Sequence, residues 1–232
     1  MSKRNLTFTI NPATDCELIV DAQPGFMPKH RHFRKGGNLP VTDGHKVVAP
    51  GNRVSRKFIR AGAKRKATRD AHPVDHCSFR EVHGVAPFTL VTHKGRQVMT
   101  FNRHCVDGTP EAELHPLVIR TGLKVYNKGY NADVESFDAF EDAAGNIATT
   151  LEADLRADGI KRLVVWGLAT DYCDVAHVLK ALAKGFEVYV VADACRAVDP
   201  AAQEKVLKQM EDAGAHIIAS KDVKVARAKR AA

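Results

Sequence analysis

Residues 162–192 read RLVVWGLATDYCDVAHVLKALAKGFEVYVVA, and this stretch decides the fold of the chain. Arg162–Trp166 is a short apolar run that is typical of a buried strand, and Glu187–Ala192 is a second run of the same kind. Between them, Asp174–Lys184 has the length and apolar pattern of a helix, which Gly185 ends. A strand, a helix and a strand in this order form a crossover between two parallel strands. The sequence therefore predicts a parallel sheet.

The segments on either side continue the alternation. Pro50 and Gly51 indicate that a helix begins after Ala49, and Lys64–Arg69 is unusually polar for a buried parallel strand. We expect strands at Glu17–Val20, Lys64–Arg69, Leu123–Asn127 and His216–Ala219, helices from after Ala49 to Ala61, at Leu151–Asp158 and at Pro200–Ala213, and a β-hairpin formed by Phe88–His93 and Gln97–Phe101. Together these elements predict a single doubly wound α/β domain over residues 1–232, with a mainly parallel central sheet and helices on both faces.

The composition agrees with one intracellular domain. A chain of 232 residues with 44% hydrophobic residues can bury one substantial core. No apolar run approaches a membrane span and the first ten residues do not resemble a secretory signal, so we expect a cytoplasmic protein. Five cysteines, odd in number and without a CxxC pair, argue against a disulfide framework and a structural zinc knuckle.

A formal net charge of +8 raises the question of an anionic partner such as nucleic acid. Much of the excess lies in residues 53–69 and in the tail from Lys221 to Arg230. Neither segment is interleaved with aromatic side chains that could stack on bases. We therefore favour a solvated basic face over a nucleic-acid site, and we expect the tail, residues 221–232, to be disordered.

Four polar groups stand where the strands of such a sheet end, namely Asp21, residues 70–76, Lys128 and Cys173. Cys173 lies at the start of a helix, where backbone N–H groups can lower a thiol pKa. It is either a nucleophile or a small buried hydrophobe. Asp21 is either a general base or the cap of a turn. Lys128 is either a solvated lysine or a charge that favours a nearby thiolate.

The string DAHPVDH at residues 70–76 is the most specific local signal. The carboxylate of Asp70 and the imidazole of His72 can reach one metal ion from an extended segment, and His104 is a candidate for a third ligand. Histidine-rich surface loops produce the same spacing by chance. The string alone therefore leaves a metal site and a solvated loop as alternatives.

Six short motifs taken together carry a family resemblance that extends from about Glu17 to His216. They are Asp21-Ala22-Gln23 with Phe26; Gly36-Gly37-Asn38-Leu39-Pro40-Val41; Asp70-Ala71-His72-Pro73 with His76 and Ser78-Phe79; His104-Cys105-Val106-Asp107-Gly108-Thr109 with Glu113-Leu114-His115; Lys128-Gly129; and Gly167-Leu168-Ala169-Thr170-Asp171-Tyr172-Cys173. In this order they closely resemble the nicotinamidase/pyrazinamidase branch of the isochorismatase-like cysteine hydrolases.

The resemblance implies a catalytic triad of Asp21, Lys128 and Cys173. Cys173 would attack the carboxamide of nicotinamide to give a thioester, while Asp21 would take the thiol proton and pass a proton to the departing ammonia. The resemblance also implies a cis peptide bond between Leu168 and Ala169, with the backbone N–H groups of Ala169 and Cys173 as the oxyanion hole. The resemblance further implies that the protein is a cytoplasmic homo-oligomer that acts in NAD salvage.

The metal set implied by the resemblance is Asp70, His72 and His104, with His76 as a further ligand or as a partner of one. The divalent ion would bind the pyridine nitrogen and orient the ring; zinc is the first expectation, with iron or manganese as alternatives. Phe26 matches the family's ring-stacking aromatic, although the residue by itself could be an ordinary core phenylalanine.

Three positions depart from the family pattern in the substrate wall. Ala71 and Phe101 stand where tryptophans are usual, and Phe137 stands where a tyrosine is usual. With Asn102 and Arg103 beside Phe101, we expect a pocket that is smaller and more basic but still aromatic. These changes affect the identity of the amide substrate more than the reaction class.

Two other functions remain as alternatives. The first is a cysteine hydrolase of the same superfamily that acts on another amide or on a carbamoyl or ureido compound, although such metal-free relatives lack the Asp-x-His string. The second is a basic nucleic-acid-binding protein, which would bind in a strongly salt-dependent manner and would not need Cys173.

Overall fold

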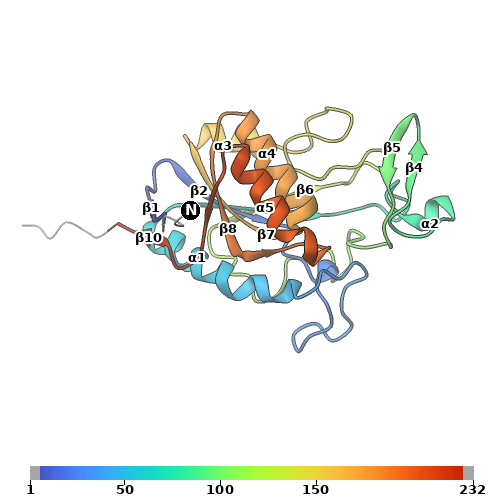
Figure 1. The fold of residues 1–232 in the computed structure, drawn as a ribbon, viewed down its shortest axis with the longest axis horizontal. Helices are drawn as coiled ribbons and strands as arrows, with labels where there is room; N and C mark the ends of the chain where they lie inside the picture. Colours follow the sequence, from blue (N-terminus) through green and yellow to red (C-terminus); the bar gives the residue numbers. More distant parts are fainter. Residues whose placement is uncertain (1–5, 227–232) are drawn as a thin grey trace, which may run out of the picture.

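The computed structural model describes residues 6–226, which form one α/β unit around a central parallel sheet (Figure 1). The sheet has six strands in the order β6-β3-β2-β7-β8-β9, and every neighbouring pair is parallel. The strands are β2 (Asp15–Val20), β3 (Lys64–Asp70), β6 (Leu123–Lys128), β7 (Arg162–Leu168), β8 (Glu187–Arg196) and β9 (His216–Ile218). This confirms the predicted fold class.

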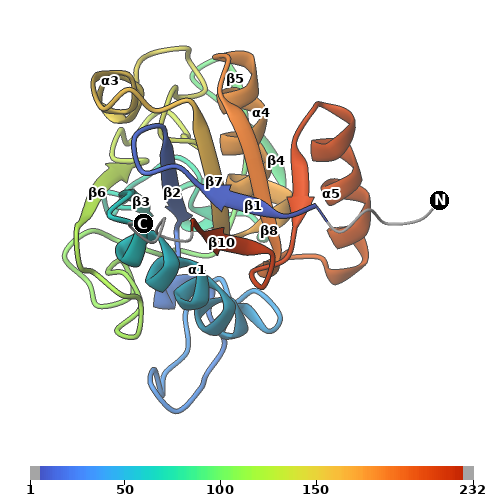
Figure 2. The same cartoon turned by 90° about the vertical axis from the view of Figure 1, so that its left-hand side faces the viewer.

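The helices cover both faces of this sheet, as Figure 2 shows. The chain moves from β2 through α1 (Val48–Ala61) to β3 in one direction, and from β7 through α4 (Val175–Ala183) to β8 in the other. Right-handed crossovers that run in opposite directions put their helices on opposite faces. The helix α1 therefore lies on one face, and α3 (Leu151–Ala157), α4 and α5 (Gln203–Asp212) lie on the other.

The reversal of direction fixes where a site can form. The two strands at which it occurs, β2 and β7, are neighbours along their whole length, from Asp15 beside Arg162 to Val20 beside Gly167. The loops that follow them diverge, which opens a crevice at their carboxyl ends. The crevice therefore lies next to Asp21 and the segment that leads to Cys173.

The polar strand β3 is a true strand, and its charges are neutralised inside the protein. Glu17 on β2 is fully buried and accepts hydrogen bonds from Arg65 Nε (2.5 Å), Ser55 Oγ (2.6 Å) and Trp166 Nε1 (2.7 Å). Lys66 Nζ lies 2.7 Å from a carboxylate oxygen of Asp158. Buried charges are tolerated when they are paired and hydrogen-bonded, which explains a strand whose composition alone is unfavourable.

The first long helix begins earlier than expected. A 3₁₀ turn at Gly44–Val47 leads directly into α1 at Val48, so Pro50 lies inside the first turn. Proline is tolerated there because the first backbone N–H groups of a helix have no partner within the helix. A Cβ added to Gly51 would lie 2.5 Å from the Trp166 ring, so this glycine lets α1 pack closely on the sheet.

The expectation that the tail, residues 221–232, is disordered needs a correction. Val223–Val225 form strand β10, which pairs in parallel with β1 (Phe8–Ile10), and Phe8 and Val223 are buried. Residues 223–225 are ordered because Val223 packs into the core and because β10 forms a small sheet with β1, which lies near the other end of the chain. Residues 227–232 lie outside the described part of the chain.

A separate arm carries the predicted hairpin. Strands β4 (Leu90–His93) and β5 (Arg96–Met99) are antiparallel, and α2 (Arg80–His83) lies next to them at the right of Figure 1. Within residues 6–226, no helix has the length and apolar character needed to cross a membrane.

The buried ion pair predicts a stability effect. Replacing Glu17 with alanine leaves Arg65 charged and without its partner inside the protein, which should lower the free energy of unfolding by about 3–5 kcal/mol. Urea denaturation measures this change. The matched control is Glu152→Ala, which removes two more exposed pairs, with Arg156 and Lys184, and should cost about 1 kcal/mol or less. Equal effects of the two substitutions would contradict the role given to the buried pair.

Candidate active site

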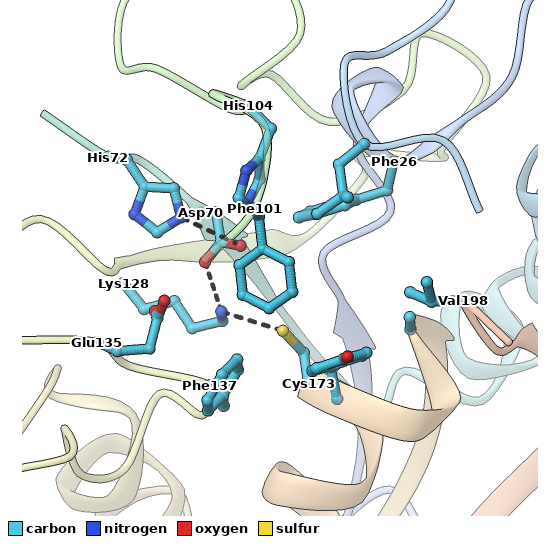
Figure 3. Close-up of a pocket in the computed structure, with 13 residues that line it drawn as sticks. Phe26, Asp70, His72, Phe101, His104, Lys128, Glu135, Phe137, Cys173 and Val198 are labelled. Atoms are coloured by element: carbon cyan, nitrogen blue, oxygen red, sulfur yellow. Dashed lines mark hydrogen bonds and ion pairs between the residues drawn. The ribbon is translucent and has the colours of Figure 1, made fainter. Parts of the chain in front are cut away.

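Four strands bring the predicted triad and Asp70 of the metal string to one place, and Figure 3 shows Asp70, Lys128 and Cys173 there. Asp21 follows β2, Asp70 ends β3 and Lys128 ends β6, while Cys173 lies in the turn after β7. All four side chains are buried. Asp70, Lys128 and Cys173 line a cavity that is open to solvent, and its other lining residues are Phe26, Leu39, His72, Phe101, His104, Glu135, Phe137, Ala169, Tyr172 and Val198.

The ammonium group of Lys128 is the centre of this arrangement. Its Nζ lies 2.5 Å from Asp70 Oδ1, 3.0 Å from Asp21 Oδ2 and 3.4 Å from Cys173 Sγ. It also donates to the carbonyl oxygen of Ser136 at 3.1 Å. The side chain is only 1% exposed, so the alternative of a solvated lysine is wrong.

The two carboxylates beside Lys128 are not equivalent. Burial alone would lower the pKa of Lys128, but Asp21 and Asp70 raise it well above its ordinary value. Burial raises the pKa of Asp70 less than Lys128 and His72 lower it, so its pKa falls and Asp70 stays ionised. For Asp21, burial outweighs Lys128 and the pKa is raised. Asp70 holds the shorter contact with the ammonium, which leaves Asp21 as the better proton acceptor.

The thiol of Cys173 corrects one expectation. We expected Lys128 and the helix start to favour thiolate, but burial raises the pKa of Cys173 well above its ordinary value and outweighs Lys128. Residues Thr170–Asp174 form a π-helical turn, so the regular helix α4 begins only at Val175. A raised pKa favours the protonated thiol, so a nucleophilic attack needs a base. One carboxylate oxygen of Asp21 lies within 4.8 Å of the sulfur.

The backbone around these residues has two unusual conformations. The peptide bond between Leu168 and Ala169 is cis, as the resemblance implied. Asp21 has a φ of 42°, in the left-handed region that non-glycine residues rarely adopt. Its N–H group bonds to the Thr68 carbonyl oxygen, and Thr68 Oγ1 donates to Asp21 Oδ1 at 2.7 Å. These contacts hold the carboxylate toward Lys128.

Asp70, His72 and His104 form a group that could hold a metal ion. Each offers one ligand atom, and these atoms lie within 4.8 Å of one another. The Nδ1 atom of His72 lies 2.7 Å from the Gly129 carbonyl oxygen, and that of His104 lies 2.7 Å from the Asn102 carbonyl oxygen. A carbonyl oxygen only accepts, so both Nδ1 atoms carry the proton and both Nε2 atoms are free to bind a metal.

His76 belongs to a different group of neighbouring ligand atoms from Asp70 and His104. One ligand atom each from His76, His72 and Glu135 lie within 4.8 Å of one another, and Asp70 and His104 are not part of this group. The Nδ1 atom of His76 lies 2.8 Å from Ser78 Oγ, while its Nε2 is buried without a hydrogen-bond partner. The sequence reasoning missed Glu135, because this residue lies in an irregular loop without any motif spacing.

Aromatic side chains line the same cavity as these polar groups. Phe26, Phe101 and Phe137 all line the cavity, as predicted. Tyr172 joins them, with its ring centroid 5.5 Å from that of Phe101 and 5.9 Å from that of Phe137. The expected basic pocket is wrong in one respect: Arg103 lies over the Phe79 ring, 5.8 Å from its centroid, and does not line the cavity.

Comparison with known proteins supports a single family. The isochorismatase domain matches residues 16–222 of the chain. A nicotinamidase from Escherichia coli (strain K12) is 37% identical over 195 residues, which cover 84% of this chain and 88% of the relative.

Two solved structures are similar over nearly the whole chain. PnC1 from L. infantum, in complex with nicotinate, is 28% identical with a TM-score of 0.78 and covers 95% of this chain and 100% of its own. A pyrazinamidase from Pyrococcus horikoshii, in complex with zinc, is 35% identical with a TM-score of 0.73 and covers 88% of this chain and 98% of its own. The chain therefore belongs to the isochorismatase family, in its nicotinamidase and pyrazinamidase branch.

Proposed function

We propose that this enzyme hydrolyses nicotinamide to nicotinate and ammonia through a thioester on Cys173. The observation that carries the proposal is the position of Lys128 Nζ, which contacts Cys173 Sγ, Asp21 and Asp70 at the edge of an aromatic cavity. A nicotinamidase at 37% identity and a structural relative with bound nicotinate support the choice of substrate. The product would enter pyridine nucleotide salvage in the cytoplasm, and a homo-oligomer stays our expectation.

The first half of the reaction uses Cys173 and Asp21. The sulfur attacks the carboxamide carbon while Asp21 accepts the thiol proton, which gives a tetrahedral oxyanion. The carbon–nitrogen bond then breaks, and the proton on Asp21 moves to the leaving nitrogen, so that ammonia departs and a thioester remains. The raised pKa of Asp21 suits a group that must accept and return a proton.

The second half returns the enzyme to its starting state. Water attacks the thioester carbon and Asp21 accepts a proton from it. The carbon–sulfur bond then breaks, nicotinate leaves, and the proton on Asp21 moves to the sulfur, which restores the thiol. We assign the oxyanion hole to the backbone N–H groups of Ala169 and Cys173, since both residues line the cavity. Lys128 keeps a positive charge beside the sulfur throughout.

We also propose a divalent metal ion held by Asp70, His72 and His104, with Glu135 and His76 next to it. The free Nε2 atoms of both histidines fit this role, and mixed imidazole and carboxylate ligands suit zinc first and iron or manganese as alternatives. When bound, the ion would hold the pyridine nitrogen and so orient the ring, with the carboxamide toward Cys173. Phe26 would then stack on that ring, because its own ring lies 5.4 Å from His104.

Ammonia release from nicotinamide tests the reaction. The purified enzyme should release ammonia and nicotinate, and Cys173→Ala should lower kcat by about 10⁴-fold or more because the covalent route is lost. Cys195→Ala is the matched control, since it removes another buried thiol outside the cavity. No ammonia from folded, metal-loaded enzyme would contradict the proposal and would direct the search to carbamoyl and other amide substrates.

A glycine substitution tests the metal set without relying on activity. A Cβ at Gly129 would lie 2.5 Å from His72 Cε1, so Gly129→Ala must displace this ligand and should weaken zinc binding by about 10–100-fold in equilibrium dialysis. Gly84→Ala is the control, because Gly84 has the same φ of +66° with nothing within 4 Å. Equal zinc affinity in the two variants would rule out His72 as a ligand. Treatment with a chelator should also abolish ammonia release until the ion is restored.

A further inference from the structure

The buried histidine of α4, His177, is not used by the proposed reaction and yet touches the nucleophile's backbone. It is fully buried. Its Nδ1 lies 2.7 Å from the carbonyl oxygen of Cys173, and its Nε2 lies 3.0 Å from the backbone nitrogen of Ala139. Both ring nitrogens are therefore engaged with backbone groups from two different segments.

The two partners permit only one form of this ring. The Cys173 carbonyl can only accept, so Nδ1 carries a proton, and the Ala139 N–H can only donate, so Nε2 has a free lone pair. The imidazole is neutral, in agreement with burial, which lowers the pKa of His177. Neither a charged histidine nor the other tautomer could make both contacts.

The residues just before Ala139 in the chain belong to the active site. Ser136 accepts a hydrogen bond from Lys128 Nζ through its carbonyl oxygen, and its hydroxyl donates to the Asp138 carbonyl oxygen at 2.8 Å. Phe137 lines the cavity and contacts Tyr172. The loop at residues 135–141 therefore sets both the position of the lysine and one wall of the cavity.

We propose that His177 is a positioning residue that ties the turn of the nucleophile to the loop at residues 135–141. The inference rests on the proposed function. The carbonyl of Cys173 and its side chain share one Cα atom, so movement of the carbonyl displaces the sulfur from Lys128 and Asp21. An error of about 1 Å in the placement of reacting groups can cost about 100-fold in rate.

Three substitutions separate the two contacts of His177. His177→Asn keeps a donor near the position of Nδ1, His177→Gln keeps an acceptor near the position of Nε2, and His177→Leu removes both at similar bulk. We expect His177→Leu to lower kcat by about 100-fold with a much smaller change in KM. His177→Asn should recover most of this loss, because it retains the contact with Cys173.

His83→Asn is the matched control. The ring of His83 also lies 2.8 Å from a backbone carbonyl oxygen, that of Cys77, but this residue is on α2, next to β4 and β5 (Figure 1), and neither His83 nor Cys77 lines the cavity. It should leave kcat unchanged even if it lowers the melting temperature. Full activity in folded His177→Leu, or a loss confined to KM, would overturn the proposal. If His177→Leu does not fold, equal kcat in wild type, His177→Asn and His177→Gln would overturn it.

Alkylation of Cys173 by iodoacetamide, followed by peptide mass spectrometry, provides a readout that needs no substrate. The rate at Cys173 should change by about tenfold in His177→Leu and stay unchanged in His83→Asn. If wild type does not hydrolyse nicotinamide but this difference is present, the proposed function fails and the positioning role stands. An unchanged alkylation rate together with an unchanged kcat would reject the positioning role, whatever the substrate.

Discussion

The buried ammonium group of Lys128 is the interaction on which the rest of the site depends. Two carboxylates and a thiol could not be buried together in one crevice without a positive charge, since an uncompensated buried charge is highly unfavourable. The lysine contacts all three groups and is itself almost fully buried. Its charge also separates the roles of its partners: the carboxylate with the closer contact stays ionised, and the other can take up a proton.

The sheet topology makes this contact possible. Lys128 and Asp70 are paired residues on the neighbouring strands β6 and β3, while Asp21 and Cys173 follow the two strands at which the crossover direction reverses. Residues more than 150 positions apart in the sequence meet because parallel strands all end at one edge of the sheet. The same sheet buries two cations of β3, since Arg65 pairs with Glu17 on β2 and Lys66 pairs with Asp158 just after α3.

The sequence predicted those parts of the site that follow from strand ends and from local motifs. Asp21 and Lys128 follow predicted strands and Cys173 lies in the turn after another, but each was ambiguous by itself, and the family resemblance was needed to assign the triad. Glu135 was not identifiable, because it reaches the site through an irregular loop whose path depends on contacts such as the one between His177 and Ala139. Strand β10 was also missed, since its partner β1 lies at the other end of the chain. The protonated thiol could not be foreseen either, because burial is a property of the assembled cavity.

Asp70 connects the two halves of the site. One of its oxygens contacts Lys128, and the other lies 3.6 Å from His72 Nε2, a candidate metal ligand. A cation bound near His72 would draw electron density from the same carboxylate that holds Lys128. The lysine would then depend more strongly on its contact with Asp21. Asp70 would therefore interact with both positive charges, that of the ion and that of Lys128. A change in the position of the ion would change the proton affinity of Asp21 through Asp70 and Lys128.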